Sequence, residues 1–182
     1  MEYSMNEMPW IKSYPPGVRW DTDIVPKPVH QLLDEAAAKW PGHSALNFMD
    51  RRITFAELLS IVNRAAKGLQ QLGVNPGAHV GLYLANTPHY LIAMFAILKV
   101  GGVIVNYSPL DPPGVLEHKI ADSETDYMLT LDLNSLYPGM ASMLDKTRLK
   151  KLIVGNIAEM SGARHHARAA PRHRTARRHQ PG

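Results

Sequence analysis

Between residues 79 and 155, four short apolar runs alternate with helical patterns, and this alternation restricts the fold more than any other feature. The runs read HVGLYL, VIVNY, DYMLTL and LKKLIVG. Apolar strands that alternate with helices are typical of a parallel sheet that is covered on both faces. Because the crossover connections in such sheets are right-handed, the pattern predicts an α/β fold: a Rossmann-like layered parallel sheet with flanking helices.

Capping signals mark where several helices begin. TFAE at residues 54–57 has the form of a capping box, and an apolar stripe follows it. Thr87 and Pro88 place a hydroxyl at the N-cap and a proline at the first position of the next helix. Asp111-Pro112 is predicted to cap another helix in the same way. SLYPGMASML predicts a broken helical stretch.

The first 28 residues are predicted to form an extended arm that lies on the body. They are rich in proline and aromatic residues and show neither a helical nor a strand period. After the arm, PVHQLLDEAAAKWPG predicts a helix that ends at Pro41-Gly42. SALNFMD and RRITF then predict two short strands joined around Asp50.

The positive charge of the chain is confined to its end. The formal net charge is +4, but residues 161–182 hold six arginines and no acidic residue, which leaves 14 basic and 16 acidic residues before them. This segment has no aromatic side chain that could stack on bases, as single-stranded nucleic-acid binders require. The abrupt change to Arg, His, Ala and Pro is what a GC-rich coding region gives in a shifted frame. We predict a disordered basic tail that is out of frame.

Several kinds of site and segment are excluded or disfavoured. The absence of cysteine excludes disulfides and thiolate-metal sites and fits a reducing compartment. The apolar stretch YLIAMFAILKVGGVIVNY is interrupted by Lys99 and two glycines, so no transmembrane segment is expected.

No metal site is expected either. His165-His166 lies among arginines, and the acidic residues near position 124 are interpreted as a solvated loop. Other histidines are interpreted as surface or cap residues: His30, His43, His79, His89 and His118.

Three stretches resemble the N-terminal part of the adenylate-forming (AMP-binding) superfamily, and bacterial long-chain fatty-acid–CoA ligases most of all. ITFAEL is similar to the first core motif of the family, LKVGGVIVNYSPL to its second, and LEHKIADSE to the helix that follows. The opening PWIKSYPPGV is similar to the start of the fatty-acyl ligases. The resemblance covers about Pro9 to Met160 and implies three parts: an arm (1–28), a partial N-terminal subdomain of an AMP-dependent synthetase or ligase (29–160), and the tail (161–182).

For a complete enzyme the resemblance implies a two-step reaction. A fatty acid and ATP form an acyl-adenylate and pyrophosphate, and coenzyme A then displaces AMP; Mg²⁺ neutralises the phosphates. Nothing in this sequence resembles the family's phosphate loop, S-G-T-T-G-x-P-K-G, or its C-terminal domain. We therefore expect an inactive fragment with an incomplete sheet and no cofactor of its own. Fatty acid, ATP and CoA would be its partners only when the missing part is supplied. A cytoplasmic location is expected, with peripheral attachment at the inner membrane as an alternative for the full-length enzyme.

No catalytic residue is assigned by the sequence. Asn106, Tyr107 and Pro109 are the only candidates for a substrate pocket, because ligand crevices of parallel sheets form beyond the carboxyl ends of strands. Packing or turn roles are the alternative for all three. Two other functions stay open: a non-catalytic binding or regulatory fragment, and a basic-tailed binder of nucleic acid or of an anionic surface.

Overall fold

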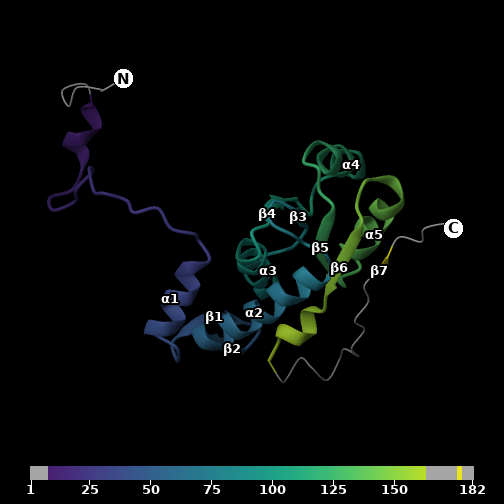
Figure 1. Ribbon diagram of the computed structural model, residues 1–182, viewed down its shortest axis with the longest axis horizontal. Helices are drawn as coiled ribbons and strands as arrows, with labels where there is room; N and C mark the ends of the chain where they lie inside the picture. The colour runs from purple at the N-terminus through teal and green to yellow at the C-terminus, as the bar shows by residue number, and fades with distance from the viewer. Residues whose placement is uncertain (1–7, 163–175, 178–182) are drawn as a thin grey trace.

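The computed structural model describes residues 8–162 and 176–177 and shows a layered body with an arm at its N-terminal end (Figure 1). In chain order the elements are η2 (Pro9–Ser13), α1 (Gln31–Lys39), β1 (Ser44–Phe48), β2 (Arg51–Thr54), α2 (Phe55–Gln71), β3 (His79–Leu82), α3 (Pro88–Lys99), β4 (Val103–Asn106), α4 (Pro113–Asp122), β5 (Tyr127–Leu131), α5 (Tyr137–Lys146), β6 (Lys151–Gly155), η3 (Ile157–Met160) and β7 (Ala176–Arg177).

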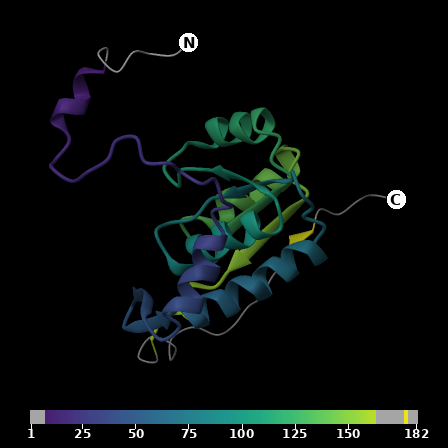
Figure 2. The same ribbon diagram turned by 60° about the vertical axis from the view of Figure 1, so that its left-hand side comes forward.

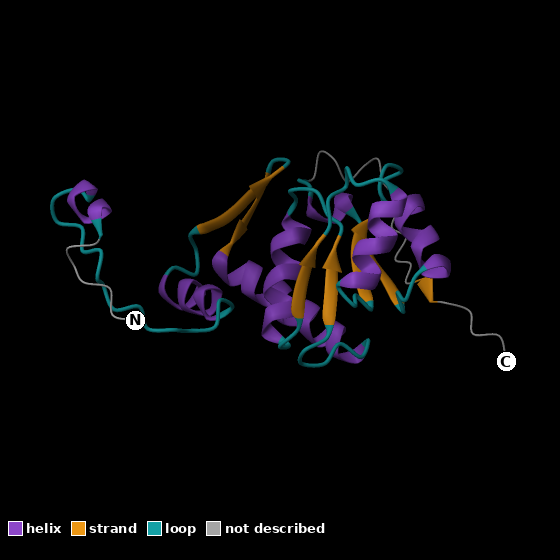
Figure 3. Cartoon of the chain, turned by 90° about the horizontal axis from the view of Figure 1, so that it is seen from above, coloured by secondary structure: helices purple, strands orange, loops and turns teal. Residues whose placement is uncertain are grey.

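The central sheet confirms the predicted α/β fold. Its strand order is β4-β3-β5-β6-β7, in which β3 to β6 run parallel and β7 pairs antiparallel with β6. Helices lie on both faces of the sheet (Figure 3). Right-handed crossovers place α3 on one face and α4 and α5 on the other for this strand order. The contacts agree, since α4 packs against α5, while α2 packs against α3. Among the described residues no strand pairs with the outer edge of β4, so one edge is open, as predicted.

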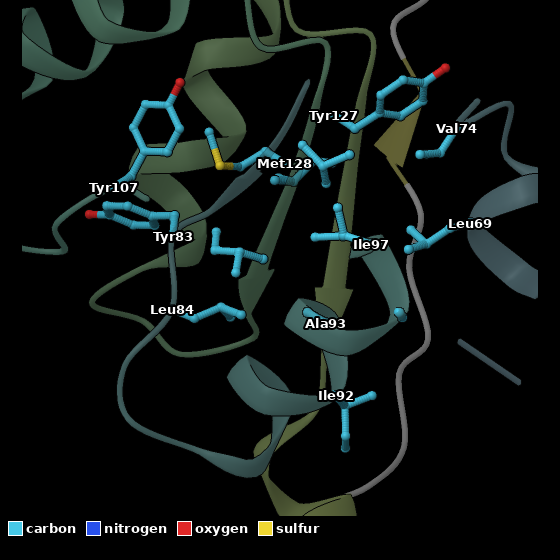
Figure 4. Close-up of a cluster of buried hydrophobic side chains, with 14 of the residues drawn as sticks. Leu69, Val74, Tyr83, Leu84, Ile92, Ala93, Ile97, Tyr107, Tyr127 and Met128 are labelled. Atoms are coloured by element: carbon cyan, nitrogen blue, oxygen red, sulfur yellow. The ribbon is translucent and has the colours of Figure 1, made fainter. Parts of the chain in front are cut away.

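Local sequence explains the longest helix, α2. The predicted capping box is present: Thr54 Oγ1 accepts from the Glu57 backbone N–H at 3.3 Å, and Glu57 Oε2 accepts from the Thr54 N–H at 2.8 Å. Gly73 follows the helix with φ of +96°, a left-handed conformation that favours glycine. The buried stripe of α2 packs against α3, and Figure 4 shows part of this cluster (Leu69, Ala93 and Ile97).

Two predicted helix details are wrong, and one is confirmed in part. Thr87 is the N-cap of α3 and Pro88 is its first residue, as predicted, but the Thr87 hydroxyl makes no capping bond and is buried without a partner among the described residues. Pro112, not Asp111, is the N-cap of α4, because the Asp111 carboxylate instead accepts from Lys119 Nζ at 2.8 Å. The stretch predicted as broken is one continuous helix, α5, because Pro138 lies in its first turn, where the missing N–H costs nothing.

The described part of the arm, residues 8–28, projects away from the body instead of lying on it (Figure 2). None of its side chains is buried, and Ile24 is 88% exposed. At its base, Lys27 Nζ lies 2.6 Å from Oε2 of Glu35, in the middle of α1. The arm therefore has few contacts that could hold the apolar side chains it exposes.

The end of the described body closes on the hairpin formed by β1 and β2. The Gly162 N–H donates to the Met49 carbonyl at 2.8 Å, and the Arg51 guanidinium donates to the Glu159 carbonyl. Ser161 and Gly162, which the prediction assigned to the tail, are thus part of the described body. Of the predicted disordered tail, Ala176–Arg177 pair with β6, while residues 163–175 and 178–182 lie outside the described residues. None of the described helices is long and apolar enough to cross a membrane.

Candidate functional site

Asn106 and Pro109 lie at the carboxyl end of β4, on the edge strand of the sheet. Asn106 is exposed, and its Oδ1 accepts from the Tyr90 hydroxyl at 3.0 Å. Pro109 is half-buried, and its carbonyl accepts from the Tyr83 hydroxyl at 3.3 Å. Both residues thus hold the loop after β4 to neighbouring elements, and their role in a substrate pocket stays a prediction.

Tyr107 is buried and its hydroxyl is fully engaged inside the protein. It lies 2.7 Å from Thr125 Oγ1 and 2.8 Å from Ser123 Oγ, and the two smaller hydroxyls are 2.8 Å apart. Figure 4 shows the ring beside Tyr83 and near Met128 in the apolar cluster. These contacts connect the end of β4 to the turn after α4. They correspond to the packing role, which was the alternative that the sequence analysis gave for Tyr107.

A cavity of about 290 Å³ lies between the sheet and the helices α2 and α3, beside β5 and β6. The neighbouring strands β3 and β5 lead to strands on opposite sides of them: β3 is connected through α3 to β4, and β5 through α5 to β6. The two connections therefore lie on opposite faces of the sheet. Ligands of open parallel sheets bind where neighbouring strands diverge in this way. The cavity lies beside this point, on the face covered by α2 and α3. Asn106, Tyr107 and Pro109 do not line this cavity.

Aliphatic side chains form most of the cavity wall. They come from α2, the end of β3, α3, β5, β6 and η3: Ala65, Leu69, Leu72, Leu84, Ile92, Ala93, Ala96, Leu129, Ile153, Val154 and Met160. The other residues at the wall are His89, Thr130, Glu159 and the glycines 68 and 155. Because side chains alternate along a strand, the Thr130 side chain shares the face of Met128 and points away from Leu129 and the cavity.

The side chain of His89 forms part of the cavity wall. It occupies the first turn of α3, and a Cβ atom built at Gly155 would lie 2.8 Å from its Cδ2, so the ring packs on β6. Both ring nitrogens are shielded from solvent, and neither makes a hydrogen bond of normal geometry to a described residue. Burial lowers the pKa of His89, while the Asn156 backbone and the charges of Glu159 and Asp132 oppose this shift. The ring is therefore mainly neutral at neutral pH, with one nitrogen able to donate and the other able to accept.

The interpretation of His89 as a surface or cap residue is wrong. Its burial could have been predicted, because His89 lies in the first turn of a helix that is apolar on nearly all sides. His79 is also engaged, since its Nδ1 lies 2.5 Å from the Ser123 carbonyl. Within residues 8–162 and 176–177, no three His, Asp or Glu side chains could together hold a metal ion.

Comparison with known proteins gives one family and two groups of relatives. Residues 33–179 match the family model of the AMP-binding enzyme. The long-chain-fatty-acid–CoA ligase of Bacillus subtilis is 26% identical over 154 residues, which are 85% of this chain and 27% of the ligase. The phosphinothricin tripeptide synthetase PhsC of Streptomyces viridochromogenes is 37% identical over 102 residues, 56% of this chain and 9% of the synthetase. The chain thus spans about a quarter of the ligase and less than a tenth of the peptide synthetase.

Solved structures share the fold. A long-chain-fatty-acid–CoA ligase from Archaeoglobus fulgidus superposes with a TM-score of 0.67 at 22% identity, over 76% of this chain and 29% of the ligase. The N-terminal subdomain of Klebsiella oxytoca NpsA superposes with a TM-score of 0.57 at 27% identity, over 61% of this chain and 29% of that chain.

Proposed function

The chain belongs to the AMP-binding enzyme family, and we propose that it forms the N-terminal part of an enzyme that activates a long-chain fatty acid as its CoA thioester. In this reaction ATP and the fatty acid give an acyl-adenylate and pyrophosphate, and coenzyme A then displaces AMP. The role proposed for the described residues is to build the first sheet and its helical layers, against which the reacting groups are held.

ATP and Mg²⁺ do not fit the part of the chain that the structure describes. No lysine or arginine lines the cavity beside β5 and β6, and no cluster of metal-ligating side chains is present among the described residues. Triphosphate binding needs cations and oriented N–H donors. We therefore assign no step of the reaction to these residues, and we expect the 182-residue chain alone not to release AMP.

We propose a fatty acid as the substrate because of the length of the segment that matches the ligase. The Bacillus subtilis ligase matches 154 residues of this chain, whereas the tripeptide synthetase matches 102. The match to the ligase is the longer one and supports a fatty-acyl substrate. The alternative is adenylation of an amino acid, and the higher identity of 37% to the peptide synthetase favours it.

Reading the genomic DNA past codon 160 in all three frames tests the proposal. We expect a loop of the form S-G-T-T-G-x-P-K-G in a shifted frame, followed by sequence similar to fatty-acid ligases. The same result would support the proposal that residues 161–182 are out of frame. A downstream sequence similar to peptide synthetases would instead support the amino-acid alternative, and unrelated sequence in every frame would overturn both.

A further inference from the structure

Exposed apolar side chains are concentrated at the N-terminal end of the described chain. Residues 8–40 expose nine large ones, whereas residues 41–162 expose four. Six of the nine belong to the arm: Trp10, Tyr14, Val18, Trp20, Ile24 and Val25. Exposed apolar surface that is concentrated in this way marks an interaction surface.

The backbone of the arm is suited to docking on another polypeptide. Five of residues 8–28 are prolines, which fix φ, so the arm loses little conformational entropy when it is ordered by a partner. The ion pair between Lys27 and Glu35 fastens its base to α1. From this base the arm runs away from the body (Figure 2), so its apolar side chains are presented to a partner and not to the body itself.

The part of a ligase outside the matched segment is the partner that fits the arm. This chain covers 27% of the Bacillus subtilis ligase and 29% of the Archaeoglobus fulgidus ligase, so most of each ligase lies outside that segment. Helices already cover both faces of the central sheet (Figure 3). Among the described residues, the arm therefore offers the remaining polypeptide the largest supply of exposed apolar side chains.

A second copy of the chain and an anionic membrane fit the arm less well. The body of a second copy, residues 41–162, exposes only four large apolar side chains against the nine of residues 8–40. Segments that bind anionic lipids typically carry clusters of about four to eight lysines and arginines. Residues 8–28 hold three basic and two acidic residues. Of the three basic residues, Arg19 lies 3.2 Å from Asp21 and Lys27 is paired with Glu35.

We propose that the arm, residues 8–28, docks through its apolar side chains on the part of a fatty-acid–CoA ligase that lies outside the segment matched by this chain, and so holds the two parts together. This inference rests on the proposed function, because its partner is the remainder of that enzyme.

Limited trypsin digestion of two proteins tests the proposal. One is the 182-residue chain, and the other is a full-length chimera in which residues 9–160 replace the matching segment of the Bacillus subtilis ligase. Mass spectrometry follows the cut after Arg19, whose side chain is 74% exposed in the free chain. We expect this cut to be at least about tenfold slower in the chimera, because a docked arm must detach before it is cleaved. Equal rates in the two proteins would overturn the proposal, and so would slow cleavage of the free chain.

AMP release by the same chimera separates this proposal from the proposed function. A protected arm without AMP release would support the docking of the arm and contradict the fatty-acid-activating role. AMP release with a rapidly cleaved arm would support that role and overturn the docking.

A double substitution in the arm locates the contact. Ile24→Asp with Val25→Asp should restore rapid cleavage in the chimera, because docking would then bury two charged groups. In the free chain the same pair should leave the urea midpoint unchanged, since the two side chains are 88% and 81% exposed. The control is Gln70→Asp with Gln71→Asp, which adds the same charge at exposed positions of α2 and should leave the cut slow in the chimera. Slow cleavage in the arm variant, or rapid cleavage in the α2 control, would contradict the proposal.

Discussion

The imidazole of His89 packs so closely on Gly155 that a Cβ atom at residue 155 would lie 2.8 Å from its Cδ2 and 3.3 Å from its Nε2. The contact joins the start of α3 to the carboxyl end of β6 and forms one side of the cavity. The two residues are far apart in the sequence but share this wall because β5 and β6 follow β3 in the sheet.

Gly155→Ala should therefore destabilise the chain by about 1–3 kcal/mol, because the ring or β6 must move to admit a methyl group. Urea unfolding followed by circular dichroism measures the change. Gly68→Ala is the matched control: Gly68 also lines the cavity, but a Cβ atom there would meet nothing within 4 Å. The control should be stabilised by about 0.5–1 kcal/mol, since alanine favours a helix interior over glycine. Equal effects of the two substitutions would contradict the packing of His89 on Gly155.

Stability should fall on acidification because of His89. Burial lowers its pKa in the folded chain, so the unfolded chain binds the proton more readily. The neutral ring's contribution is fully present above the unfolded pKa of about 6.5 and declines as the pH falls towards the folded pKa. The pH dependence of unfolding free energy should be shallower in His89→Gln than in the unmodified chain below about pH 6.5. If the unfolding free energy of the variant depended more steeply on pH, the folded chain would favour the charged His89 ring, which contradicts the prediction.

The buried hydroxyl cluster at Tyr107 should contribute measurably to stability. Tyr107→Phe removes the group that lies 2.7 Å from Thr125 Oγ1, and we expect a loss of about 1–2 kcal/mol in unfolding free energy. Tyr90→Phe provides the comparison, because the Tyr90 hydroxyl bonds the exposed Asn106 and water can replace it. That variant should lose less than about 0.5 kcal/mol. A larger loss in Tyr90→Phe would contradict the assignment of Tyr107 to the core network.

Features that depend on neighbouring residues could be predicted from the sequence, and those that depend on distant ones could not. Thr54 and Glu57 cap α2 as predicted because a capping box needs only four consecutive residues. Asp111 has the right position for a cap, but Lys119, two helical turns later, takes its carboxylate. The cavity was missed because α2, α3, β5 and β6 all contribute to it, and no local pattern marks such a wall.

The Lys99–Asp34 pair should stabilise the packing of α1 against the body only modestly. Lys99 Nζ lies 2.6 Å from Asp34 Oδ1, and the two side chains remain 24% and 39% exposed. Asp34→Asn should lower the unfolding free energy by about 0.2–1 kcal/mol, and the difference should shrink in high salt. Glu35→Gln is the control, since its partner Lys27 lies in the exposed arm. An effect of Glu35→Gln as large as that of Asp34→Asn would contradict this account.

A chimeric enzyme tests most directly whether this chain supplies the first layer of a fatty-acid-activating enzyme. Residues 9–160 replace the matching segment of the Bacillus subtilis ligase, and AMP release is measured with ATP, CoA and palmitate. A parallel chimera carries the matching segment of the Archaeoglobus fulgidus ligase, whose structure is 22% identical to this chain. We predict palmitate-dependent and CoA-dependent AMP release from both chimeras. A soluble chimera of this chain that unfolds cooperatively but releases no AMP, while the parallel chimera is active, would contradict the proposed role.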